Sequence, residues 1–215
     1  MRYCVPGTLR AALIAVLALS CAGCAGILGK ERTPPAIYVL SLDSTDAPAS
    51  AGTCGTLEVS QPDPAPGFAS SRMVYQREPH RLEPFAYARW AEPPAPMVQA
   101  ALVEALARSG QFTAVLAAPS AVLPDFRLET DSLRVLQSFE GDSSQVLVEL
   151  NIHLIDVKQA RLLAVQRVSA SMPASANPAG GVDAANRALA KIIDDLLELA
   201  RRSIDCSQRP SATQS

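Results

Sequence analysis

Residues 145–157 (QVLVELNIHLIDV) alternate apolar and polar side chains more regularly than any other segment of the chain. The apolar residues recur at every second position, namely Val146, Val148, Leu150, Ile152 and Leu154. Successive side chains of a β-strand point to opposite faces of the sheet. The segment therefore predicts a long strand with one buried face and one polar face. A second layer of structure must cover the buried face.

Six further segments have the composition or alternation of strands. They are residues 37–42, 56–60, 72–76, 82–90, 125–139 and 161–170. The short polar link between 72–76 and 82–90 predicts a hairpin, in which Pro84 requires an edge position or a bulge. Proline, glycine and small residues predict loops at 61–71 and 169–181.

Two segments carry apolar residues at helical spacing. In residues 97–108 the stripe consists of Val98, Leu102, Ala105 and Leu106, preceded by three prolines and followed by Gly110 as a C-terminal cap. In residues 182–204 it consists of Val182, Ala185, Leu189, Ile192, Ile193, Leu196 and Ala200. The order strands, helix, strands, helix predicts an α+β fold. We expect a largely antiparallel β-sheet with both amphipathic helices packed on one face.

The N-terminus has the pattern of an export signal. Arg2 and Arg10 precede an apolar run of about ten residues, which is too short to span a bilayer. Small residues then lead to Cys24, which is typical of a bacterial lipoprotein cleavage site with a lipidated cysteine. Cys21 is the alternative acceptor. Ala25 follows Cys24 where an aspartate would favour the inner membrane, so the sequence favours the outer membrane.

These observations divide the chain into four parts. We expect a signal peptide at 1–23, a lipidated cysteine with a proline-containing tether at 24–36, a folded domain at 37–206 and a disordered tail at 207–215. The domain keeps two cysteines, Cys54 and Cys206, which in an oxidising compartment either form one disulfide or remain free thiols. The sequence leaves both states open.

No known catalytic or metal-binding motif is present in the sequence. The two histidines, His80 and His153, have no second ligand at zinc spacing, and there is no GxSxG or Walker motif. The prediction is a non-enzyme without cofactor or metal, in which His153 is a solvent-facing strand residue and not a base. The absence of a basic run and the 5% aromatic content argue against nucleic-acid binding.

Three groups of residues, taken in order, resemble one known family. The first is Tyr38-Val39-Leu40. The second is the hairpin-to-helix unit, with Met73–Gln76, Tyr87–Trp90, Pro94 and Leu102 through Phe112. The third is Asp125–Leu128 with Phe139, the strand from Val146 to Leu154 and the last helix. With the leader, they resemble the ABC-type transport auxiliary lipoproteins, in particular the PqiC-like, MCE-associated group.

The resemblance implies a function that periodicity alone does not. Such lipoproteins are non-catalytic partners of envelope ABC systems, in which a permease and ATPase work with a periplasm-spanning MCE-domain protein to move lipids. The implied location is the periplasmic face of the outer membrane, with palmitate-type acyl chains as the anchor. A homo-oligomer is an arrangement that fits such a docking element. An envelope lipoprotein with a structural or assembly role is the alternative, followed by a secreted hydrolase.

Four residues are candidate partner contacts. They are Phe68, at the end of the proline-rich loop, and Tyr87, Arg89 and Trp90 in the second arm of the hairpin. The competing interpretation of Trp90 is a core residue between hairpin and helix.

Overall fold

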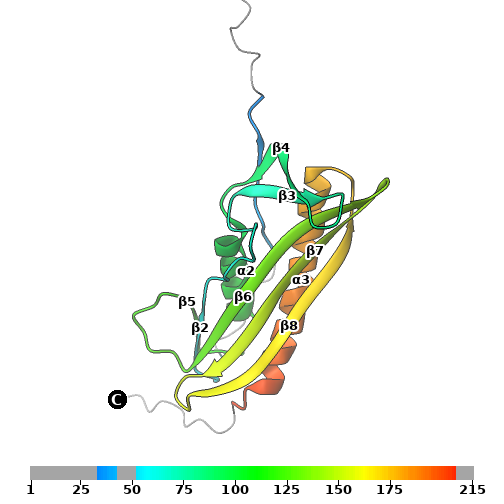
Figure 1. Cartoon of the computed structure of the whole chain (residues 1–215). Helices are drawn as coiled ribbons and strands as arrows, with labels where there is room; N and C mark the ends of the chain where they lie inside the picture. Colours follow the sequence, from blue (N-terminus) through cyan, green and yellow to red (C-terminus); the bar gives the residue numbers. More distant parts are fainter. Residues whose placement is uncertain (1–32, 43–51, 207–215) are drawn as a thin grey trace, which may run out of the picture. The chain divides into compact units, whose positions relative to one another are not determined.

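An eight-stranded sheet covered by two helices makes up the computed structural model, which describes residues 33–42 and 52–206 (Figure 1). One compact unit begins at Pro35. The predicted leader, Cys21 and Cys24, most of the tether and the tail 207–215 lie outside the described residues. Within the described ranges, no helix is long and apolar enough to cross a membrane.

Three long strands form the larger of the two antiparallel parts of the sheet. β6 pairs with β7, and β7 pairs with β8, over almost their full lengths. The strands of the whole sheet are β1 (Ala36–Tyr38), β2 (Thr56–Val59), β3 (Arg72–Gln76), β4 (Leu82–Trp90), β5 (Ala114–Ala117), β6 (Phe126–Glu140), β7 (Ser143–Asp156) and β8 (Arg161–Ala174). The α+β class is therefore confirmed, and so is the β3–β4 hairpin, which is antiparallel with a bulge after Arg72.

The sheet is mixed and not wholly antiparallel. The free side of β6 pairs in parallel with β2 near its start and with β3 near its end. β5 pairs with β2, and β1 pairs with β4, and both of these pairs are also parallel. Parallel neighbours arise here because these short strands reach the sheet through long connections and not through tight hairpin turns. Local alternation carries no information about that pairing.

The buried face of the sheet is the one predicted from alternation. Val146, Val148, Leu150, Ile152 and Leu154 of β7 are all buried. In β6, the inward positions change from even to odd numbers at a bulge, so that Leu128 and Leu133 both point into the core. Ser132 lies at this bulge in the left-handed region, with a φ of 58°. The register shift places both Asp131 and Ser132 outside the core.

Both helices cover this buried face. α2 (Pro94–Arg108) packs on β2 and β5, and α3 (Pro178–Ser203) packs on β7 and β8 (Figure 1). Prolines begin α2, as predicted, and Gly110 follows its last turn with a φ of 65°. The predicted apolar face of α3 is buried from Val182 to Ala200.

The predicted loop at 169–181 is wrong in extent. β8 continues to Ala174, and α3 already begins at Pro178. The strand continues because backbone groups of β7 pair with β8 as far as Ser144. This pairing does not depend on large or β-branched side chains in β8. The helix begins early because the Asn177 side chain accepts a hydrogen bond from the N–H of Gly180 at 2.8 Å.

Candidate functional site

Polar side chains cluster on the outer face of the sheet at the β6 bulge. Asp131 Oδ1 accepts hydrogen bonds from Asn151 Nδ2 at 2.8 Å and from Ser132 Oγ at 2.6 Å. Asp131 Oδ2 lies 2.9 Å from His153 Nε2. The hydrogen bond from Ser132, followed by those from Asn151 and His153, lowers the pKa of Asp131 below its ordinary value. This carboxylate is thus held in its ionised form by its neighbours.

The cluster borders an open hollow of about 310 Å³. Asp63 and Glu129 also line it. Nucleophilic catalysis by a serine needs its hydroxyl within hydrogen-bond reach of the base. Here Ser132 donates to Asp131, and His153 contacts that same carboxylate, so serine and histidine bind one acceptor and not each other. No group of three or more metal-ligating side chains is present in the part of the chain that the structure describes.

Ion pairs cover much of the remaining outer face. Arg127 donates a hydrogen bond to the Glu58 carboxylate at 3.0 Å, and the Glu149 carboxylate lies between the guanidinium groups of Arg167 and Arg134. Glu58 and Glu149 are themselves buried, and the arginines compensate their charges. These groups account for the polar face of the long strands without requiring a ligand.

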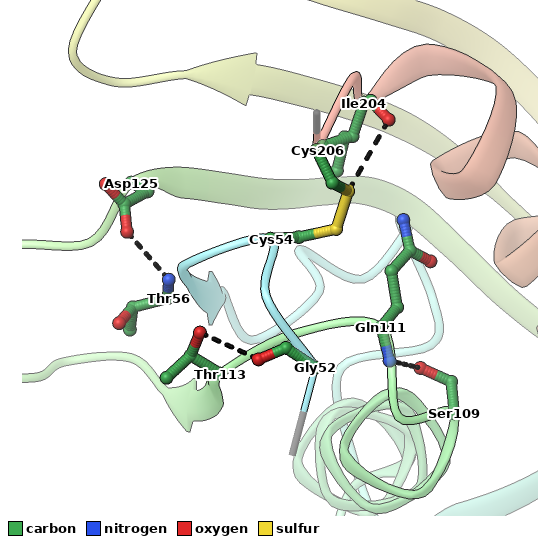
Figure 2. Close-up of a disulfide and its surroundings, with 9 residues drawn as sticks. All are labelled: Gly52, Cys54, Thr56, Ser109, Gln111, Thr113, Asp125, Ile204 and Cys206. Atoms are coloured by element: carbon green, nitrogen blue, oxygen red, sulfur yellow. Dashed lines mark hydrogen bonds between the residues drawn. A yellow bond between two sulfur atoms is a disulfide. The ribbon is translucent and has the colours of Figure 1, made fainter. Parts of the chain in front are cut away.

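A disulfide links the two ends of the domain sequence. It joins Cys54, just before β2, to Cys206, just after α3, with a Cα–Cα distance of 4.7 Å (Figure 2). Figure 2 shows that the same corner is held by Thr113, whose hydroxyl donates to the Gly52 carbonyl at 3.0 Å. The N–H of Thr56 donates to Asp125 at 2.8 Å. The arrangement is structural, because the sulfur atoms are bonded and Cys54 is buried.

The four candidate partner contacts divide into two buried and two exposed residues. Phe68 is 8% exposed and Trp90 is 4% exposed. A partner could reach neither without rearrangement, which corrects their proposed role at the surface and agrees with the core interpretation of Trp90. Tyr87, by contrast, is 67% exposed, and Arg89 is also exposed. Both therefore remain available for contact.

Two residues that the sequence did not single out lie beside Arg89. Ile37 of β1 is its register partner on one side and Arg72 of β3 on the other. Directly opposed residues of paired strands point to the same face. Ile37 is 59% exposed, and Arg72 is exposed. The sequence shows an arginine at the start of β3 and an isoleucine in the edge strand β1. It does not show that the two residues lie on either side of Arg89, which follows only from the strand register.

One family model matches most of the folded domain. The model of a family described as ABC-type transport auxiliary lipoprotein component matches residues 38–196. The crystal structure of protein XCC0632 from Xanthomonas campestris is 25% identical, with a TM-score of 0.67, and the match covers 78% of this chain and 98% of that one. A second crystal structure, of a protein described as uncharacterized, is 17% identical with a TM-score of 0.59, covers 77% and 98% of the two chains, and shows the fold alone. No curated protein matches the sequence.

Proposed function

Since the chain belongs to the ABC-type transport auxiliary lipoprotein family, we propose that it is the non-catalytic lipoprotein subunit of an MCE/ABC-type lipid transport system. Its role is to dock the periplasm-spanning MCE component at the outer membrane, where acyl chains on the cysteine hold the domain at the periplasmic face. The inner-membrane permease and ATPase complete the system. The family match over residues 38–196 is the observation that carries this proposal.

The anchor is supported by the sequence before the domain. Cys24 follows a short apolar run and precedes Ala25, which does not favour retention at the inner membrane. Each buried methylene of an acyl chain contributes about 0.8 kcal/mol, so two or more palmitate-type chains hold a domain without a spanning helix. The proposed acceptor is Cys24, with Cys21 as the alternative.

A non-catalytic role is supported by the geometry around Asp131. The serine and histidine there share one carboxylate and do not form a nucleophile–base pair. The buried charges of the outer face have partners of opposite sign within the sheet. The proposal therefore assigns these polar groups to the stability of the strands, and predicts that His153→Ala leaves any transport phenotype unchanged.

Co-purification from the native envelope tests the proposal. The full-length chain, expressed with its own leader and extracted in mild detergent, should retain an MCE-domain protein. The peptide beginning at Cys24 should carry acyl mass, and Cys24→Ala should remove the protein from the outer membrane whereas Cys21→Ala should not. Envelope defects of a deletion strain without altered lipid transport, and without a co-purifying MCE protein, would instead support a structural or assembly role. Turnover that His153→Ala abolishes would support a hydrolase.

A further inference from the structure

We propose that the exposed surface formed by Ile37, Arg72, Tyr87 and Arg89 is a contact site for a phospholipid bilayer, which these side chains bind through lipid phosphates and interfacial acyl carbons. This surface is called the β1–β4 patch below. The inference rests on the lipid anchor of the proposed function and goes beyond it, because it assigns an orientation to the domain on the membrane.

The first observation is an unusual pair of like charges. Arg72 and Arg89 are directly opposed on β3 and β4. Like charges in this position destabilise a sheet. In the described residues, neither arginine forms an ion pair within 4.0 Å, whereas Arg81 of the same hairpin contacts both Glu78 and Glu83. Two adjacent guanidinium groups with open donors fit phosphate oxygens, which arginine binds in bidentate geometry.

The second observation is the apolar surface on each side of the arginines. Tyr87 lies two positions before Arg89 on the same strand and therefore shares its face, and Ile37 is the register partner of Arg89. Val39 is also exposed, two residues after Ile37. A tyrosine and aliphatic side chains next to arginines form the composition found at membrane–water interfaces.

The third observation is the position of the patch along the chain. β1 begins at Ala36, 12 residues after Cys24, and 12 extended residues span at most ~40 Å. A lipidated Cys24 therefore keeps the start of β1 within ~40 Å of the bilayer, and a lipidated Cys21, 15 residues before β1, within ~50 Å. The β5–β6 loop lies at the other end of the sheet from β4 (Figure 1). Its Leu123 is 79% exposed, but the chain order gives that loop no comparable link to the anchor.

These observations favour a bilayer over a protein as the occupant. The tether raises the local concentration of membrane at the patch, and each arginine near an anionic surface favours contact by about fivefold. The domain would consequently stand with β1 and β4 toward the bilayer and with the β5–β6 loop away from it. That orientation leaves the opposite end of the domain for the transport partner.

Fluorescence quenching in vesicles tests the contact. The full-length chain carrying Tyr87→Trp is produced with its leader, its acylation is verified by mass, and it is reconstituted in phosphatidylethanolamine–phosphatidylglycerol vesicles containing lipids with brominated acyl chains. Emission of the indole introduced by Tyr87→Trp should be quenched after subtraction of the buried Trp90 signal, and quenching should decrease at 0.5 M NaCl. In the same vesicles, the indole introduced by Leu123→Trp should remain unquenched.

Charge variants identify the groups responsible. Arg72→Gln with Arg89→Gln should lower the contact equilibrium by about 25-fold, at fivefold per arginine. The matched pair Arg161→Gln with Arg201→Gln, which removes the same charge from exposed positions elsewhere, should leave quenching unchanged.

Four results would overturn this proposal alone and leave the lipid anchor in place. The first is an acylated Tyr87→Trp variant that is not quenched, and the second is equal quenching of the Tyr87→Trp and Leu123→Trp variants. The third is an equal effect of the two charge pairs on quenching. The fourth is a set of arginine variants that retain quenching but no longer co-purify with the MCE protein. The last result would assign the patch to a protein partner. Protein without acyl mass would refute the anchor and this proposal together, whereas acylated Tyr87→Trp protein without quenching would refute this proposal alone.

Discussion

The disulfide between Cys54 and Cys206 should contribute a large share of the domain's stability. The two cysteines are separated by 152 positions, so the bond closes nearly the whole described domain into one loop. In the chain-entropy model, a loop of this length lowers the free energy of folding by about 5 kcal/mol relative to the reduced chain. A change of 1 kcal/mol shifts the melting temperature of a domain of this size by about 2–4 °C. Reduction should therefore lower Tm by roughly 10–20 °C.

Thermal unfolding followed by far-UV circular dichroism, with and without a strong reductant, measures this effect. Cys54→Ala, Cys206→Ala and the double variant should all melt near the temperature of the reduced protein. The double variant should show no response to reductant, which controls for effects on other cysteines. All comparisons should use protein in the same detergent, because the proposed acyl chains require one.

Two outcomes would refute the reasoning. Two alkylatable thiols in the native, unreduced domain would show that the bond does not form. A Tm shift of less than about 3 °C in a protein that has the bond would show that the unfolded chain is already restricted, so that loop closure removes little entropy.

Three further changes test other parts of the structure. Gly181→Ala would place a Cβ in steric overlap with Oε1 of buried Gln137, and should lower the free energy of unfolding by about 1–3 kcal/mol, measured by urea denaturation. Asn177→Ala removes the cap of α3 and should cost about 1 kcal/mol in the same assay, where an unchanged midpoint would contradict the capping role. The lowered pKa of Asp131 means that its contribution to stability is complete above its unfolded pKa of about 3.8 and is lost as pH falls through the lower folded value. Asp131→Asn should therefore be less sensitive than the wild type to acid below about pH 4 in pH-dependent unfolding, by a small amount because Asp131 is partly exposed.

The elements that the sequence predicts well are those stabilised by a repeated local pattern. β7 and α3 each bury one side of a regular period, and that regularity is visible in the residues themselves. No local pattern indicates the parallel pairing of β2 with β6, because the paired residues Leu57 and Phe126 are 69 positions apart in the sequence. The bulge in β6 was also missed, since one extra residue at Asp131–Ser132 resembles the end of an alternating run.

The surface residues show the same division. Exposure of Tyr87 and Arg89 agrees with their proposal as contacts, but side-chain type alone did not separate them from buried Trp90 and Phe68. The alternation of β4 places Trp90 inward and Arg89 outward, which becomes decisive only when the face that the helices cover is known. Arg72 could not be joined to Arg89 from the sequence, because a bulge sets the hairpin register there.

The sharing of one edge of β6 by β2 and β3 has a consequence for how this chain acquires its structure. In the proposed export, which starts at the N-terminus, β2 and β3 emerge long before residues 126–138, with which both strands pair, have crossed the membrane. Until then, β3 can pair with β4, β1 with β4 and β2 with β5, but the central strand that joins these pairs into one sheet is missing. Such a long sequence separation slows folding, because the chain must lose the entropy of closing a large loop before the stabilising contacts between these strands can form. Under the proposed export, the emerging first half is thus an open, pairing-competent intermediate of the kind that chaperones bind.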